Sequence, residues 1–262
     1  MPRHLGTVQA VTGEHARRMP PIFVITCEHG GNAVPAEYAS RFASAGARAA
    51  IQSHRGYDPG AFEAALQFSR SLGVEPISST TSRLLVDLNR STDNPELLSK
   101  FTQNLSPSET AVLLERHYFP YRHRVTAAIE KGITDHHQVF HLSIHTFTPR
   151  IRGVWRDIDV GLLFDPARKS EAEFCERWQQ ELACQFPSLR VRPNEPYKGV
   201  DDGFTTVLRR QFADHDYVGV EVEINNRFAK RSVDAQAKRV KALLQTLPHR
   251  THFLDGSDTH PS

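Results

Sequence analysis

The chain has 262 residues, enough for one large α/β domain or two small ones with a hydrophobic core. Its 32 lysines and arginines nearly balance 30 aspartates and glutamates, so the net charge of +2 gives no reason to expect nucleic acid or an anionic membrane as a partner. The three cysteines match neither a disulfide framework nor a metal-binding spacing. Residues 1–21 lack the apolar core of a signal peptide, and no run approaches the ~20 apolar residues of a membrane span. These features predict a cytoplasmic protein.

Strand-like and helical segments alternate along the chain. Apolar runs rich in β-branched residues predict strands at 22–27, 76–79, 84–88, 139–144, 159–164 and 217–224. Apolar residues at helical spacing predict helices at 61–72, 108–131, 170–186 and 232–247. Ser108 and Gly73 are the expected N-terminal and C-terminal caps of two of these helices.

The alternation predicts an α/β fold in which a mostly parallel sheet is covered by helices on both faces. No internal repeat or linker interrupts the pattern, so we expect a single domain at residues 21–248. Residues 1–20 are expected to form a loose N-terminal arm, and the polar residues 249–262 a frayed C-terminal tail.

Polar side chains follow four of the expected strands. In an open α/β sheet the carboxyl ends of the strands carry the ligand site, so residues far apart in sequence should converge there. Two histidines and a carboxylate fit a catalytic zinc site, which uses three protein ligands and leaves a position for water. Another carboxylate could then act as the general base. The polar groups concerned are Glu28 and His29, Asp87, Asn89 and Arg90, His145, and Glu221 and Glu223.

Each group also has a structural interpretation that involves no catalysis. A histidine after a strand is often an ordinary hydrogen-bonded loop residue, and Asp58 precedes Pro59 and could simply initiate a turn. Arg83 could belong to a structural ion-pair network, and Tyr197 could merely pack in its Pro/Gly-containing loop. It is the combination of these residues that favours a metal site over the structural interpretation.

Taken together, six segments in order resemble the N-formylglutamate amidohydrolase family. The resemblance extends from about Pro21 to Leu247. The segments that carry it are Glu28–Pro35, His54–Ala61, Ser82–Arg90, His145–Pro149, Asn194–Tyr197 and Glu221–Asn225.

This resemblance implies a three-layer α/β/α sandwich around a mixed, mostly parallel sheet, as in the zinc carboxypeptidases and the aspartoacylase group. It further implies bound Zn²⁺, or another divalent metal, and hydrolysis of the amide bond of an N-acyl acidic amino acid. The family's namesake reaction converts N-formyl-L-glutamate to formate and L-glutamate, a step of histidine degradation. The expected partner is therefore a small molecule, and the expected assembly a monomer or a small homo-oligomer.

The resemblance also implies roles for individual residues. His29 and His145 match the two zinc histidines, and Glu223 matches the general base. Arg83 matches an arginine that polarises the scissile carbonyl or grips a second carboxylate. Asn89 and Arg90 match the pair that holds the substrate carboxylate, for which the planar fork of arginine is well suited. Tyr197 is expected to close over the substrate.

One departure concerns the third metal ligand. The zinc carboxypeptidases carry a glutamate ligand three residues after the first histidine, and here that position is Asn32. A neutral amide is a poor replacement for an anionic ligand, so Asp58 is the expected third ligand. His54 and Asn32 are the alternatives, and Asn32 is otherwise expected to bind substrate.

Two other functions remain open at this point. The chain could hydrolyse a different N-acyl amino acid or a short peptide, because pocket volume rather than residue type decides the acyl length. It could also be a metal-free ligand-binding protein on the same fold, which Asn32 favours. Cys27 precedes the expected site but has no obvious activating partner, so it is not expected to be a nucleophile.

Overall fold

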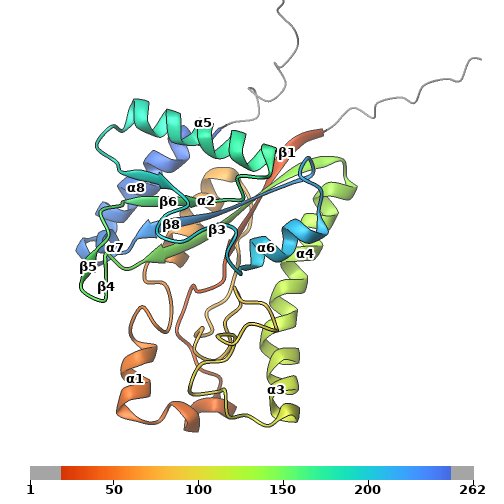
Figure 1. Ribbon diagram of the computed structural model, residues 1–262, viewed down its shortest axis with the longest axis vertical. Coiled ribbons are helices and arrows are strands. Elements are labelled where there is room, and N and C mark those ends of the chain that lie inside the picture. Colours follow the sequence, from red (N-terminus) through yellow and green to blue (C-terminus); the bar gives the residue numbers. More distant parts are fainter. Residues whose placement is uncertain (1–18, 249–262) are drawn as a thin grey trace, which may run out of the picture.

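The fold is built around a six-stranded sheet, seen in a computed structural model that describes residues 19–248 (Figure 1). β1 pairs in parallel with β2 and β3, and β3 with β8, whereas β6 runs antiparallel to β8 and parallel to β7. The predicted mixed, mostly parallel sheet is therefore confirmed. In spatial order the strands are β2 (Ile77–Ser78), β1 (Met19–Cys27), β3 (His137–Phe147), β8 (Tyr217–Asn225), β6 (Val160–Leu163) and β7 (Val191–Pro193).

Helices cover both faces of the sheet, because side chains alternate along each strand and give it two apolar faces. Leu142 lies in one hydrophobic cluster with residues of α2, α5 and α8, and Val139 lies in another with residues of α4 and α6. This confirms the α/β/α layering. The bounds are α2 (Ala61–Leu72), α5 (Lys169–Gln185) and α8 (Val233–Thr246) on one face, and α4 (Phe119–Thr134) and α6 (Phe204–Gln211) on the other.

Beyond the carboxyl end of β1 the chain builds a lower part made mainly of loops (Figure 1). It contains η1 (Ala36–Phe42), α1 (Ala45–Ile51), the long loop after β2 and α3 (Pro107–Leu113). The sequence did not predict η1 and α1, nor several short elements later in the chain. These are the hairpin of β4 (Arg150–Ile151) and β5 (Val154–Trp155), the strand β7, and the helices α6 and α7 (Arg227–Arg231).

The prediction of a strand at 84–88 was wrong. Leu85 and its neighbours are buried, which explains the apolar run, but their backbone groups bond to turns and side chains instead of to a neighbouring strand. The Leu85 carbonyl accepts from the Thr102 hydroxyl, and the Asp87 N–H donates to the Leu97 carbonyl. The apolar run therefore reflects a buried loop, which side-chain pattern alone does not distinguish from a short buried strand.

The predicted helix at 108–131 is divided. It begins two residues earlier than Ser108 suggested, with Ser106 as the N-cap in a capping box with Glu109. α3 then passes through a π-helical turn, η2 (Leu114–Tyr118), into α4. Pro120 explains the interruption, since proline lacks the N–H of a regular helical bond and its ring clashes with the carbonyl four residues earlier. The remaining predicted helices and strands agree with the structure to within a few residues.

The expected terminal segments lie almost entirely outside the described residues. Of the N-terminal arm only Met19 and Pro20 are described, and they belong to β1. The pairing between β1 and β3 is irregular from Met19 to Ile22. Pro20 and Pro21 lie in this interval, and because proline has no N–H to donate, it fits where the regular hydrogen-bond ladder is interrupted. No helix among residues 19–248 is long and apolar enough to cross a membrane.

Candidate metal centre and its pocket

The sheet brings the two predicted zinc histidines to the same edge. His29 lies in the turn two residues after the end of β1, and His145 lies near the carboxyl end of β3, the parallel neighbour of β1. Asp58 occupies the turn before α2, where its N–H donates to the His29 carbonyl over 2.9 Å. β8 lies on the other side of β3, with Glu223 directly opposite His145 in the register. These four side chains are all buried.

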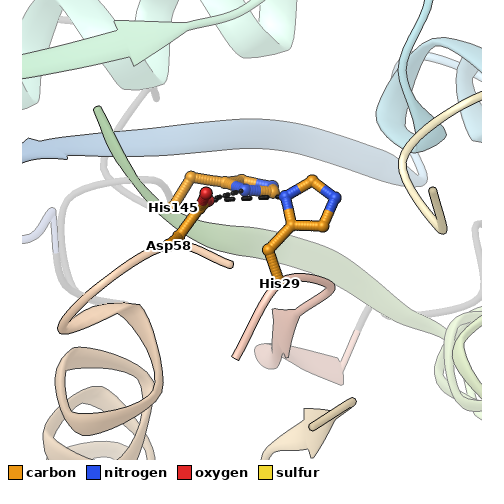
Figure 2. A group of neighbouring side chains, drawn as sticks. All are labelled: His29, Asp58 and His145. Carbon is orange, nitrogen blue, oxygen red and sulfur yellow. Dashed lines mark hydrogen bonds and ion pairs between the residues drawn. The ribbon is translucent and has the colours of Figure 1, made fainter. Parts of the chain in front are cut away.

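His29, Asp58 and His145 form a cluster in which each offers one ligand atom within 4.8 Å of the others (Figure 2). Nδ1 of His145 lies 2.9 Å from Oδ2 of Asp58, and Nδ1 of His29 lies 3.4 Å from the same oxygen. Both imidazoles therefore turn the same ring nitrogen toward one carboxylate. Two imidazoles and a carboxylate are the protein ligands of many catalytic zinc sites.

The contacts of His29 show that its Nδ1 is available to a metal. Its other nitrogen, Nε2, lies 2.7 Å from Oδ1 of Asp87. An ionised carboxylate only accepts hydrogen bonds, so Nε2 carries a proton, and in the neutral imidazole Nδ1 keeps its lone pair. Although buried, Nδ1 has no hydrogen-bond partner among the described residues. A metal-binding histidine typically donates the N–H of one ring nitrogen to a carboxylate and offers the other ring nitrogen to the metal. Nε2 and Nδ1 of His29 fit these two roles, so the cluster fits a divalent metal.

Neighbouring charges shift the pKa values of this cluster strongly. Burial alone would lower the pKa of His145, but hydrogen bonds to Asp58 and Glu28 outweigh it and raise the pKa well above its usual value. Burial would likewise raise the pKa of Asp58, but His29 and the bond from His145 lower it well below the usual range. In the metal-free protein these hydrogen bonds favour the protonated form of His145, with an Nδ1–H directed at Asp58.

Metal binding should therefore release protons. A metal needs the lone pair of each Nδ1, and the pKa values of both His145 and His29 are raised, so we expect one or more protons to be released per zinc bound at pH 7. Because the pKa of His145 is raised, the apparent zinc affinity should increase as pH rises towards that pKa. Calorimetric titration with zinc in buffers of different ionisation enthalpy measures this release. A binding enthalpy that is independent of the buffer would contradict it.

The cluster opens into a cavity of about 190 Å³. Glu223 lines it, and one of its carboxylate oxygens, Oε2, has no hydrogen-bond partner among the described residues. Burial, reinforced by Asp58 and Glu221, raises the pKa of Glu223 to about 7, against the lowering effect of His145. A carboxylate that exchanges a proton near neutral pH suits general acid–base catalysis.

Most of the predicted substrate-binding residues also line the cavity. Arg83, Asn89, Arg90 and Tyr197 all reach it from loops. Asn89 is oriented by the Phe204 N–H, which donates to its Oδ1 over 2.7 Å, so its amide nitrogen faces away from Phe204. Arg83 also donates to Oδ2 of Asp87 over 2.7 Å and to Oδ1 of Asp58 over 3.4 Å. It thereby links the pocket wall to the cluster.

Two predicted residues are placed differently. The structure does not bring Asn32 into the cavity: its amide donates to Oε1 of Gln52 over 3.1 Å. His54 lines the cavity but does not belong to the His29–Asp58–His145 cluster. Of the three alternatives for the third ligand, Asp58 is therefore the one that the geometry supports. Cys27 is buried, and that burial raises the pKa of its thiol, as expected of an unreactive cysteine.

Several pocket residues were missed by the sequence analysis. Asp201 and Asp202 come from the loop before α6, and Asp202 ties that loop to Ser91 and Asn94. No sequence pattern predicts such a contact between two loops. Lys198, next to Tyr197 in the sequence, is the third cationic side chain in the lining, besides Arg83 and Arg90.

The fold and the site together define a class: an α/β protein with a buried His–Asp–His cluster suited to a metal, beside a small polar pocket. Residues 22–229 match the N-formylglutamate amidohydrolase family. The structure resembles that of gene product Atu2144 from Agrobacterium tumefaciens, with a TM-score of 0.75, 25% sequence identity, and coverage of 89% of this chain and 91% of the other. It also resembles N-formylglutamate amidohydrolase from Ralstonia eutropha JMP134, with a TM-score of 0.63, 19% identity and coverage of 88% and 93%.

A comparison with curated proteins finds no match. The family match nonetheless extends over most of the described residues and contains all members of the cluster. The chain belongs to the N-formylglutamate amidohydrolase family.

Proposed function

We propose that the protein hydrolyses N-formyl-L-glutamate to formate and L-glutamate, with a zinc ion held by His29, Asp58 and His145. The observation that carries this proposal is the buried cluster of these three residues beside Glu223 in a family amidohydrolase. Bound there, a zinc ion would act as a Lewis acid on the amide carbonyl and lower the pKa of a coordinated water to about 7.

Glu223 is the residue proposed to move the proton. Its position opposite His145 places it beside the cluster, and its Oε2 is free to accept. In its ionised form Glu223 takes a proton from the attacking water, and it then returns the proton to the nitrogen that leaves. A raised pKa favours both halves of this transfer, because a base that is too weak cannot accept the proton and an acid that is too weak cannot return it.

The cationic side chains of the cavity lining, which also contains carboxylates such as Asp201 and Asp202, support an acidic substrate. N-Formylglutamate carries two carboxylates at neutral pH, and the lining offers three cationic side chains, those of Arg83, Arg90 and Lys198. Arg90, with the Asn89 amide beside it, is proposed to bind the α-carboxylate. The Asp202 carbonyl accepts from Nη1 of Arg90 over 2.5 Å and so orients its guanidinium group. Arg83, next to Asp58, is proposed to stabilise the developing oxyanion.

The size of the cavity favours a small substrate over a peptide. Its volume of about 190 Å³ lies below the roughly 300–1,000 Å³ of sites for drug-sized ligands. A formyl or other short acyl group on one amino acid is therefore the substrate class that the pocket fits best.

The proposal is tested by a panel of N-acyl amino acids with the zinc-loaded protein. N-Formyl-L-glutamate, N-acetyl-L-glutamate, N-succinyl-L-glutamate and N-formyl-L-leucine are compared by release of the free amino acid. We expect the highest kcat/KM for N-formyl-L-glutamate and a marked loss for the leucine derivative, which lacks the second carboxylate. A preference for succinyl or for leucine would reject the assigned substrate while leaving the metal centre untouched.

Replacing Arg90 should weaken substrate binding. Arg90→Lys keeps the charge but loses the planar fork, so we expect KM for N-formyl-L-glutamate to rise about 10- to 100-fold, equivalent to the ~1.5–3 kcal/mol of a hydrogen bond to a charged group. Zinc content should be unchanged. Arg70→Lys, on the exposed side of α2, is the matched control. An unchanged KM in Arg90→Lys would show that another residue holds the carboxylate.

A further inference from the structure

Glu28 is a buried carboxylate that the proposed mechanism does not use. It stands directly before His29 in the sequence, yet its side chain faces the other metal histidine, His145. That side chain is 0% exposed and does not line the cavity. Since taking a carboxylate out of water is costly, the contacts of Glu28 should reveal what its charge does.

Three groups surround the Glu28 carboxylate. The Tyr121 hydroxyl donates to Oε1 over 2.8 Å, and the Ser143 hydroxyl donates to Oε2 over 2.7 Å. Nε2 of His145 lies 3.2 Å from Oε2 of Glu28 and 2.9 Å from the Ser143 oxygen. The Ile77 carbonyl also lies within 3.1 Å of the Tyr121 hydroxyl, but Glu28 is nearer and charged, which favours it as the acceptor.

The direction of these hydrogen bonds follows from the charge of Glu28. An ionised carboxylate has no proton to give, so the Ser143 hydroxyl proton must point at Glu28. The Ser143 oxygen then offers only lone pairs to His145, and Nε2 of His145 must carry a proton. Its other nitrogen, Nδ1, which faces Asp58, is thereby left to supply the lone pair that a metal needs.

We propose that Glu28 is a positioning residue that acts through Ser143 to hold His145 in the Nε2–H form, with Nδ1 directed to the metal. The inference rests on the metal centre of the proposed function, but it does not depend on the substrate. Glu28 lies beside Nε2 of His145 as Asp87 lies beside Nε2 of His29. Each of the two histidines therefore has a carboxylate next to the ring nitrogen that does not face Asp58.

A purely structural role for Glu28 makes a different prediction. Tyr121 belongs to α4, Ser143 to β3 and Glu28 follows β1, so Glu28 could serve only to join these elements. Glutamine has nearly the same volume and could keep those contacts. Its amide group, however, can donate to Ser143, which would then donate to Nε2 of His145 and leave the imidazole proton on Nδ1. Glu28→Gln therefore reverses the chain of hydrogen bonds with little change in packing.

The test measures zinc affinity by competition with a chelator of known affinity, and the visible spectrum of the cobalt-substituted protein. For Glu28→Gln we expect about 10- to 100-fold weaker zinc binding and an altered cobalt spectrum. Glu28→Asp, which keeps the charge, should lie closer to wild type than Glu28→Gln. The matched control is Glu171→Gln, which changes another fully buried carboxylate held by Arg209 and the Gly219 N–H; it should leave zinc affinity unchanged. A folded Glu28→Gln protein with wild-type zinc affinity and cobalt spectrum would overturn the proposal.

A second measurement needs no variant. Imidazole ¹⁵N signals of the zinc-loaded wild-type protein should show His145 with zinc on Nδ1 and the proton on Nε2. The opposite arrangement would overturn the proposal even if Glu28→Gln fails to fold. Because these readouts follow the metal rather than turnover, they remain decisive if N-formyl-L-glutamate is not the substrate. A wild-type protein that binds no zinc would instead reject the metal centre itself.

Discussion

The Asp58→Asn variant is expected to lose both tightly bound zinc and hydrolytic activity. Asparagine keeps the size of the side chain, but it removes the anionic ligand between His29 and His145. Since a catalytic metal supplies several kcal/mol of transition-state stabilisation, and 1.36 kcal/mol corresponds to a factor of ten, we expect kcat/KM to fall by about 10³-fold or more. Metal analysis after dialysis and an assay with N-formyl-L-glutamate measure the two losses.

The matched control for this variant is Asp234→Asn, an exposed aspartate in the first turn of α8. It should retain zinc and turnover. An Asp58→Asn protein that keeps both at the wild-type level would show that Asp58 is not a metal ligand, and would return His54, which lines the same cavity, to consideration.

The Glu223→Gln variant should separate proton transfer from metal binding. Glutamine cannot accept or return the proton, so we expect kcat to fall by about 10²–10⁴-fold, the usual contribution of general acid–base catalysis. Zinc content and KM should change little, because Glu223 does not belong to the His29–Asp58–His145 cluster. Steady-state kinetics with metal analysis of the same preparation measures this separation.

Glu173→Gln, on the exposed side of α5, controls for the loss of a carboxylate elsewhere and should behave as wild type. If Glu223→Gln retained a normal kcat, the general base would have to be another group. If it lost its zinc as well, Glu223 would belong to the metal centre rather than to proton transfer.

Local sequence pattern was sufficient for five of the six strands of the sheet and for much of the site. A buried run such as Ile22–Cys27 has few alternatives to a strand, and α2 lies between two glycines with positive φ that mark its ends. His29 and His145 could be brought together from sequence because parallel neighbouring strands place their carboxyl ends at one edge. Glu223 followed for the same reason, as a residue near the end of a third strand.

What could not be predicted depends on how loops fold back. The run at 84–88 has the side chains of a strand, but its backbone bonds are made by Thr102 and Leu97, far along the chain. Asn32 lies three residues after His29, yet α1 draws its amide to the Ile51 carbonyl and to Gln52. The number of residues between Asn32 and His29 does not determine where the Asn32 side chain points.

The contacts of Glu28 and Asp87 with the two histidines could not be predicted from the sequence for a related reason. Glu28 adjoins His29 in the sequence, but in the turn after β1 its side chain contacts His145 of the neighbouring strand β3. Asp87 reaches His29 only because the buried loop around it is closed by contacts with residues such as Leu97. Sequence analysis therefore identified the candidate ligands, and the structure adds the groups that orient them.

The most direct test of the account is to titrate zinc into the metal-stripped wild-type protein while release of L-glutamate from N-formyl-L-glutamate is followed. If His29, Asp58 and His145 hold a catalytic metal, the rate should rise in proportion to bound zinc and level off at about one equivalent per chain. Full turnover by the stripped protein, with no further increase on adding zinc, would contradict the account.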